Sequence, residues 1–362
     1  MTRKLRVGLL YGGASAEHDV SQLSAANVLD ALVPSRYEVV PIGIARDGRW
    51  RVTEHRDGAL PPIAEDGPEI ALIPGGRGRV ALADGSTEFE ALDLVFPVLH
   101  GPNGEDGTVQ GSLELANVAY VGSGVLGCAA TMDKDVAKRL MRDAGLPIVP
   151  FVTIRSDRPG TYEDAVATLG TSDLFVKPAY MGSSVGVARA RSRDEFARAC
   201  EDAFRYDRKL LVERAVACAR EIECAVLENA AGEIRPSPLG EIAPAESHGF
   251  YSYDAKYVDA AGAALRIPAD LPAERARHIQ ALAVRTFELL CCEGLARIDF
   301  FVEPGGASDS EAGVYVNEAN ALPGFTSISM YPKLWEAAGL RPSDLMDVLI
   351  EHALARHRRR PQ

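Results

Sequence analysis

Two short segments in the last third of the chain carry polar side chains at a spacing that could bind a metal ion. The segments are ARIDFFVE and VYVNEAN, and both have the apolar composition of strands. Side chains alternate between the faces of a strand, so Arg297 shares a face with Asp299, and Glu318 shares a face with Asn320. The Gly- and Asp-rich residues 304–313 can turn the chain back between the two strands. Paired side by side, the strands would gather all four polar groups.

Three oxygen ligands beside a cleft suit a hard cation such as Mg²⁺, which also keeps waters and substrate phosphates in its shell. We therefore predict a metal site at Asp299, Glu318 and Asn320. Three apolar neighbours are expected to face the core: Ile298, Phe300 and Val316. The alternative is an exposed strand face with an incidental salt bridge.

A second candidate is the loop in KPAYMGSSVG, residues 177–186. Lys177 ends a strand, and the glycines and serines after it leave backbone N–H groups bare, which favours binding of an anion such as phosphate. The loop is neither a Walker A motif nor a kinase glycine loop. A flexible hairpin tip is the alternative.

Other segments would complete a nucleotide and substrate site. The strand KLLVERAV can offer its backbone to an adenine edge, with Glu213 near the ribose. Glu17 and His100 each follow a buried strand, at the end of a parallel sheet where ligands bind in open α/β folds. A helix-capping carboxylate and a structural histidine are the alternatives. The tyrosine-rich residues 250–259 could close over a cleft, or could be a packed surface loop.

The elements that must position these groups alternate between strand and helix at the start of the chain, which predicts a parallel sheet. Residues 51–90 are rich in Gly, Pro and Asp and show little pattern. The segment VLGCAATMDKDVAKRLMRDAGL predicts one long helix ending near Gly145, and the short strands after it predict a largely antiparallel sheet. We predict an α/β lobe over 1–122, a small α+β lobe over 123–218 and a larger α+β lobe over 219–362.

Composition narrows the class of protein. The 362 residues have 47% hydrophobic content and a net charge of −12, which argues against a broad nucleic-acid surface. The basic run 356–360 is expected to be a solvated tail of the last helix. None of the six cysteines has C-x-x-C spacing, and most are expected to be small buried hydrophobes in a reducing compartment. No apolar run approaches the length of a membrane span, so we expect a cytoplasmic protein.

Taken together, the motifs resemble the D-alanine–D-alanine ligase family, which has the ATP-grasp fold. The resemblance spans nearly the whole chain and rests on eight segments in the same order: GGASAEHDVS, HGPNGEDGTVQG, YVGSG with MDK, VKPAYMGSSVGV, REIE, FYSYDAKY, RIDFF and NEANALPGFTSISMYPKLW. It implies a nucleotide held between two sheets behind an N-terminal Rossmann-like lobe. It also implies ATP and two Mg²⁺ (or Mn²⁺) ions as cofactors, D-alanine as substrate, a role in peptidoglycan precursor synthesis, and a homodimer.

The resemblance also implies roles for individual residues. Those implied to contact ATP are Lys134, Lys177, Ser183, Ser184 and Lys256 on the phosphate side, with Glu213 and Glu221 on the nucleoside side. The two metal ions would be bound by Asp299, Glu318 and Asn320. Glu17 would hold the amino group of the first D-alanine and form a hydrogen-bonded triad with Ser183 and Tyr257. The substrate side would be lined by His100, Arg297, Gly324 and Ser329.

The sequence departs from the family pattern at two positions, with Ser252 where many members have Asp and Ala321 where many have Thr. Neither removes a proposed catalytic group, and Tyr257 in the lid favours an amide over an ester product. Three alternatives stay open at this point. They are another ATP-grasp carboxylate–amine ligase, a nucleotide-dependent regulatory protein without turnover, and an NAD-dependent oxidoreductase, although the last lacks the G-x-G-x-x-G fingerprint.

Overall fold

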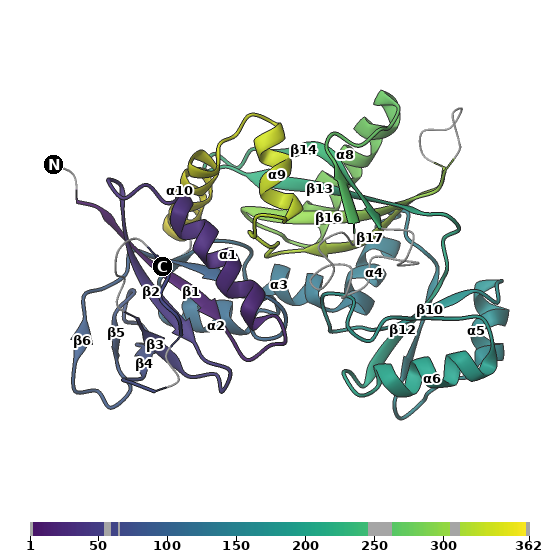
Figure 1. The fold of residues 1–362 in the computed structure, drawn as a ribbon, viewed down its shortest axis with the longest axis horizontal. Helices are drawn as coiled ribbons and strands as arrows, with labels where there is room; N and C mark the ends of the chain where they lie inside the picture. The colour runs from purple at the N-terminus through teal and green to yellow at the C-terminus, as the bar shows by residue number, and fades with distance from the viewer. Residues whose placement is uncertain (1–2, 54–58, 64–65, 245–262, 305–311, 360–362) are drawn as a thin grey trace.

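The computed structural model describes residues 3–53, 59–63, 66–244, 263–304 and 312–359. Figure 1 shows an N-terminal lobe at the left, a small lobe at the lower right and a larger sheet between and above them. The three larger sheets fall within the three segments proposed from the sequence, whose boundaries stay a prediction.

The first lobe is built on a five-stranded sheet in the order β3-β2-β1-β7-β8. Its strands are Leu5–Gly12 (β1), Tyr37–Ile44 (β2), Trp50–Val52 (β3), Leu94–Val98 (β7) and Ala119–Tyr120 (β8). All neighbouring pairs are parallel except β2 with β3. The predicted parallel sheet is therefore confirmed.

Residues 51–90, which show little pattern in the sequence, contain short strands that sequence analysis did not predict. Besides β3, they include the antiparallel strands Ile70–Leu72 (β4), Val80–Leu82 (β5) and Glu88–Phe89 (β6). Each has only two or three residues, too few for an alternation of apolar and polar positions to be recognised.

Helices from both ends of the chain pack on the first sheet. They are His18–Ala31 (α1), Thr108–Leu115 (α2) and the last helix, Pro342–Arg359 (α10). In Figure 1, α1 and α10 lie beside each other. Leu9, Val28 and Leu349 belong to one buried core, so the C-terminal helix completes the N-terminal lobe.

The expectation that the basic run is solvated is wrong for Arg356. Its side chain is buried, and its guanidinium donates to the backbone oxygens of Tyr120 and Gly122. It also lies over the Tyr120 ring, 4.3 Å from the centroid. Arg356 therefore satisfies carbonyl groups at the end of the first sheet, where the chain leaves the N-terminal lobe.

The long helix predicted at the start of the second lobe, from about residue 125 to Gly145, is two helices, Val125–Met132 (α3) and Lys134–Asp143 (α4). Asp133 separates them with an extended backbone, and its carboxylate accepts from the N–H groups of Asp135 and Val136. The N–H of Lys134 donates to the carbonyl of Ala179 in the second lobe. Capping and this long-range bond together explain the break, because each takes up an N–H that a continuous helix would have used.

The second lobe has an antiparallel sheet in the order β11-β10-β12-β9, as predicted. Its strands are Phe151–Arg155 (β9), Leu174–Pro178 (β10), Ala188–Ala190 (β11) and Lys209–Arg214 (β12). Two helices, Tyr162–Leu169 (α5) and Arg193–Ala203 (α6), pack on the sheet with a shared apolar core.

The third sheet has the order β15-β14-β13-β16-β17 and is antiparallel throughout. Its strands are Arg220–Glu228 (β13), Ile234–Pro244 (β14), Ala263–Arg266 (β15), Leu295–Val302 (β16) and Val314–Asn320 (β17). The helices Ala273–Leu289 (α8) and Met330–Ala337 (α9) pack against it. Ile222 and Val226 join the core with α8, whereas Ala225 and Leu227 join the core with α9, so the two helices cover opposite faces.

Within the part of the chain that is described, no helix is both long and apolar enough to span a lipid bilayer.

Candidate active site

The two polar strand segments pair as expected, antiparallel, as β16 and β17. Asp299 lies opposite Glu318, and Arg297 lies opposite Asn320. The Arg297 guanidinium donates twice to Asp299, from Nε to Oδ1 and from Nη2 to Oδ2, both at 2.7 Å. Asn320 Nδ2 donates to Asp299 Oδ2 at 2.9 Å. The predicted gathering of the four polar groups is confirmed, and their role in metal binding stays a prediction.

The opposite side of these strands is apolar, also as expected. Ile298, Phe300 and Val316 are at most 1% exposed. The pairing shifts by one residue after Asp299, so Asn317 is an extra residue on β17. Such a bulge redirects a side chain, and Asn317 Oδ1 accepts from Lys177 Nζ at 3.4 Å. The bulge thus links the polar strand pair to the second lobe.

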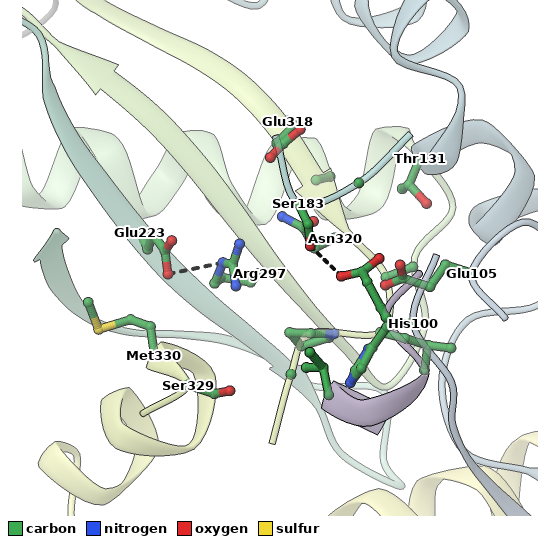
Figure 2. A pocket seen from close by; sticks show the side chains of 18 of the residues that line it. His100, Glu105, Thr131, Ser183, Glu223, Arg297, Glu318, Asn320, Ser329 and Met330 are labelled. Carbon is green, nitrogen blue, oxygen red and sulfur yellow. Dashed lines mark hydrogen bonds and ion pairs between the residues drawn. The ribbon is translucent and has the colours of Figure 1, made fainter. Parts of the chain in front are cut away.

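A third carboxylate, which sequence reasoning missed, lies on the neighbouring strand. Glu223 on β13 is buried, and its Oε2 lies 3.0 Å from Arg297 Nε (Figure 2). Burial opposes the charge of Arg297, but Asp299 and Glu223 outweigh it and raise the pKa of the guanidinium well above its usual value. The motif REIE contained the signal, because Glu223 is two residues from Glu221 and therefore shares its face of the strand.

Two of the predicted phosphate-binding lysines lie at the edge of this polar cluster. Lys134 Nζ is 3.3 Å from Glu318 Oε2 and donates to the carbonyl of Met181 at 2.8 Å. Lys177 Nζ is 2.8 Å from Glu213 Oε2. The ammonium group of Lys134 therefore lies between the third sheet and the loop that follows β10, and that of Lys177 lies between the third sheet and β12.

The Glu213 side chain, near the end of β12, is buried and paired with two lysines. Its side chain is 4% exposed and lies between Lys177 and Lys138, whose Nζ is 2.9 Å from Glu213 Oε1. Burial would raise the pKa of Glu213, but the two lysines outweigh it and lower the pKa. A contact of Glu213 or Glu221 with a nucleoside stays a prediction.

The small-residue loop has the backbone that an anion site needs. Ser183 and Ser184 have φ of 52° and 59°, and Gly186 has φ of 71°. Ser183 Oγ donates to Glu17 Oε1, so the predicted contact between loop and first lobe is present (Figure 2). A Cβ on Gly182 would lie 3.2 Å from Glu17 Oε2, so glycine allows this close approach.

The first lobe contributes two further titratable groups. His100 Nε2 lies 3.0 Å from Ser24 Oγ, and burial outweighs the nearby Glu17 to lower the pKa of the ring, which favours neutral imidazole. Glu105, which was not among the predicted site residues, also lines the cavity, while the neighbouring Asp106 accepts from Thr108 N–H. Burial, and then repulsion from Glu17, raise the pKa of Glu105 to about 8.

Nine of the predicted residues line one cavity among the three lobes, whereas five others are not among its lining residues: Lys177, Ser184, Glu213, Glu221 and Asp299. Figure 2 shows side chains from all three lobes around it. The predicted residues that line it are Glu17, His100, Lys134, Ser183, Arg297, Glu318, Asn320, Gly324 and Ser329. Ser329 Oγ accepts from Thr326 N–H at 3.0 Å, and a Cβ on Gly324 would approach this hydroxyl to 2.8 Å. Lys256 and Tyr257, predicted for the lid, lie outside the described residues.

The comparisons with known proteins agree along the whole chain. Residues 6–123 match the family model described as "D-ala D-ala ligase N-terminus", and residues 140–351 match "D-ala D-ala ligase C-terminus". The chain belongs to the D-alanine–D-alanine ligase family. Membership in this family implies the use of ATP, a divalent metal ion and D-alanine.

Individual relatives cover almost the full length. The chain is 62% identical to D-alanine–D-alanine ligase B of Bradyrhizobium diazoefficiens, over 99% of this chain and 95% of that protein. Among solved structures, a D-alanine–D-alanine ligase from Coxiella burnetii matches with a TM-score of 0.80 and 36% identity, covering 98% of this chain and 96% of that one. The VanG D-Ala:D-Ser ligase from Enterococcus faecalis matches with a TM-score of 0.82 and 32% identity, covering 97% and 100%. The ATP-grasp fold predicted from the sequence is thereby confirmed.

The donor set in this ligase fold suits a magnesium-like cation. Asp299 and Glu318 offer carboxylate oxygens, and Asn320 offers an amide oxygen because its Nδ2 is directed to Asp299. Among the described residues no three His, Cys, Asp or Glu side chains form a metal cluster by themselves. Two carboxylates and an amide are an incomplete shell, which fits a cation that takes its remaining ligands from water and nucleotide phosphates.

Proposed function

We propose that this chain catalyses the ATP-dependent ligation of two D-alanine molecules to D-alanyl-D-alanine for peptidoglycan precursor synthesis. The observation that supports it most directly is the cavity that joins the Glu17–Ser183 hydrogen bond to Lys134 and to Arg297. One site then contains a carboxylate (Glu17) that can bind an amino group, an ammonium group (Lys134) that can bind phosphate, and a guanidinium (Arg297) that can stabilise an oxyanion. Because ATP is a cytoplasmic nucleotide, we place the reaction in the cytoplasm.

In the first step, Glu17 holds the amino group of the first D-alanine. The substrate carboxylate attacks the γ-phosphorus, the bond to ADP breaks, and an acyl phosphate forms. Lys134, Lys177 and the backbone of the loop at Ser183 and Ser184 balance the charge of the phosphates. Two Mg²⁺ or Mn²⁺ ions held by the carboxylate–amide set described above would add to this neutralisation when bound.

In the second step, the amine of the second D-alanine attacks the acyl carbon. The tetrahedral intermediate then expels phosphate, which takes up the proton that the nitrogen loses. Arg297 and the N–H of Gly324 stabilise the oxyanion, while His100 and Ser329 line the substrate side. Water must be excluded, because it would hydrolyse the acyl phosphate. The lid role predicted for Lys256 and Tyr257, which lie outside the described residues, would serve this purpose.

The test is phosphate release from ATP in the presence of D-alanine and Mg²⁺, with the product identified by mass. We expect D-alanyl-D-alanine, and little phosphate release with L-alanine or D-lactate. An arm with D-alanine plus D-serine is needed because one similar structure is a D-Ala:D-Ser ligase. Preferential formation of the mixed dipeptide, or ATP binding without D-alanine-dependent phosphate release, would overturn the proposal.

We further propose that the enzyme is a homodimer. Three leucines on helices of the first lobe and the adjoining α3 are more than 60% exposed: Leu23, Leu115 and Leu126. Exposed apolar side chains of this size are compatible with a subunit contact. Light scattering decides the matter, since a monomer at micromolar concentration would contradict it.

A further inference from the structure

Beneath the proposed phosphate site lies a lysine with no access to solvent. Lys138 is on α4, about one turn after Lys134, and its side chain is 0% exposed. Its Nζ lies 2.9 Å from Glu213 Oε1, while the other oxygen of the same carboxylate lies 2.8 Å from Lys177 Nζ. One carboxylate on β12 therefore holds two ammonium groups, one from α4 and one from β10.

Packing does not explain a lysine at this position. Ala137 and Met141, on the same helix, are buried in an apolar core. Transferring an ammonium group out of water costs several kcal/mol, and apolar residues that replace both partners of a buried ion pair often do so without loss of stability. A fully buried lysine is rare unless it is paired, and Lys138 meets this condition only through Glu213, which already pairs with Lys177.

The charges in this triad do not cancel. Lys138 and Lys177 carry two positive charges, and Glu213 carries one negative charge. With Glu213 and Lys177 alone, the ion pair would be neutral, and the attraction of Lys177 for a phosphate would be offset by the adjacent carboxylate. The second ammonium restores a positive charge below the loop.

We propose that Lys138 is a positioning residue for nucleotide binding, which binds one oxygen of Glu213 so that Lys177 stays available to the phosphates of ATP. Lys138 acts through Glu213 and does not touch the nucleotide. This inference rests on the proposed function, because that function assigns Lys177 to the phosphates.

The first test is Lys138→Met, which keeps the length of the side chain and removes its charge. We expect the KM for ATP to rise about tenfold or more, as for the loss of one partly screened charge interaction. The kcat and the KM for D-alanine should change less than threefold. The matched control is Arg139→Met, the next residue on α4, whose side chain is 57% exposed and paired with Asp135. The control removes the same charge on the solvent side and should leave the KM for ATP unchanged.

A pH profile separates positioning from a purely structural role. Burial lowers the pKa of Lys138 to about 8, although Glu213 and Glu318 raise it and Lys177 lowers it further. Above that pH the free enzyme loses this proton, and binding of phosphates must take it back. The Kd for ADP with Mg²⁺, measured by calorimetry, should therefore rise about tenfold between pH 7 and pH 9, and Lys138→Met should flatten the rise.

Each outcome decides the question. Unchanged KM for ATP and an unchanged pH profile in a folded Lys138→Met would overturn the inference, as would an equal effect of Arg139→Met. If Lys138→Met does not fold, Lys138→Gln, which can still bond Glu213, replaces it with the same expectation. If neither folds, the profile is measured in Glu105→Gln, which removes the other group at the cavity with a pKa near 8. A Kd that is independent of pH between 7 and 9 in this variant overturns the inference. Failure of the proposed function is distinct, because wild-type enzyme would then release no phosphate with D-alanine.

Discussion

The two ionic clusters at the cleft have opposite compositions. In the cluster on β13, β16 and β17, the three carboxylates of Glu223, Asp299 and Glu318 outnumber the two cations that pair with them, Arg297 and Lys134. In the triad of Lys138, Lys177 and Glu213, two ammonium groups surround one carboxylate. A surplus of negative charge suits a cation and a surplus of positive charge suits phosphate. We call the carboxylate-rich cluster the acidic half of the site and the lysine-rich triad the basic half. In each half, the sign of the net charge indicates whether a metal ion or a phosphate would bind there.

The acidic half is tested most strongly by Asp299→Ala and Glu318→Ala. We expect each to reduce kcat by about 10³-fold, because the transferring phosphoryl group loses its charge neutralisation. Thermal unfolding should show an intact fold. Asp157→Ala, which removes an exposed carboxylate far from the cleft, is the control and should retain activity. Normal ligase activity of both variants would refute the metal assignment.

The basic half is tested by Glu213→Gln. Removing the shared charge leaves two buried ammonium groups with no carboxylate between them. We expect the free energy of unfolding to fall by about 3–5 kcal/mol, the usual cost of breaking a buried ion pair. Urea denaturation measures this loss. A fall below about 1 kcal/mol, which is typical of exposed pairs, would show that the triad is better solvated than its geometry indicates.

Glu105 belongs to neither cluster and differs from the carboxylates of both, because no ion pair is found for it among the described residues. Burial raises the pKa of Glu105 in the folded state to about 8, against about 4.5 when unfolded. Its contribution to stability is therefore complete below pH 4.5 and is lost as the pH rises towards 8. We expect Glu105→Gln to reduce the loss of unfolding free energy over this range by about 1 kcal/mol per pH unit. Parallel stability profiles of the variant and the wild type would contradict this assignment.

Local patterns in the sequence determined much of the fold and half of the site. Alternation along β16 and β17 predicted that Arg297, Asp299, Glu318 and Asn320 would meet, and the pairing confirms it. This succeeds because a period of two residues depends only on strand geometry. The same local reasoning missed the break at Asp133, since the bond from Lys134 N–H goes to Ala179, which follows β10 much further along the chain.

The contacts within the basic half of the site could be known only from the tertiary structure. Lys138, Lys177 and Glu213 lie on three elements, and no spacing relates them before the chain folds. Arg356 likewise belongs to a basic run in the sequence, yet it is buried against the first sheet. Strand alternation is a short-range property that a sequence displays directly. Burial of a charge and its choice of partner depend on which distant elements pack together, and that depends on the summed packing of the whole chain.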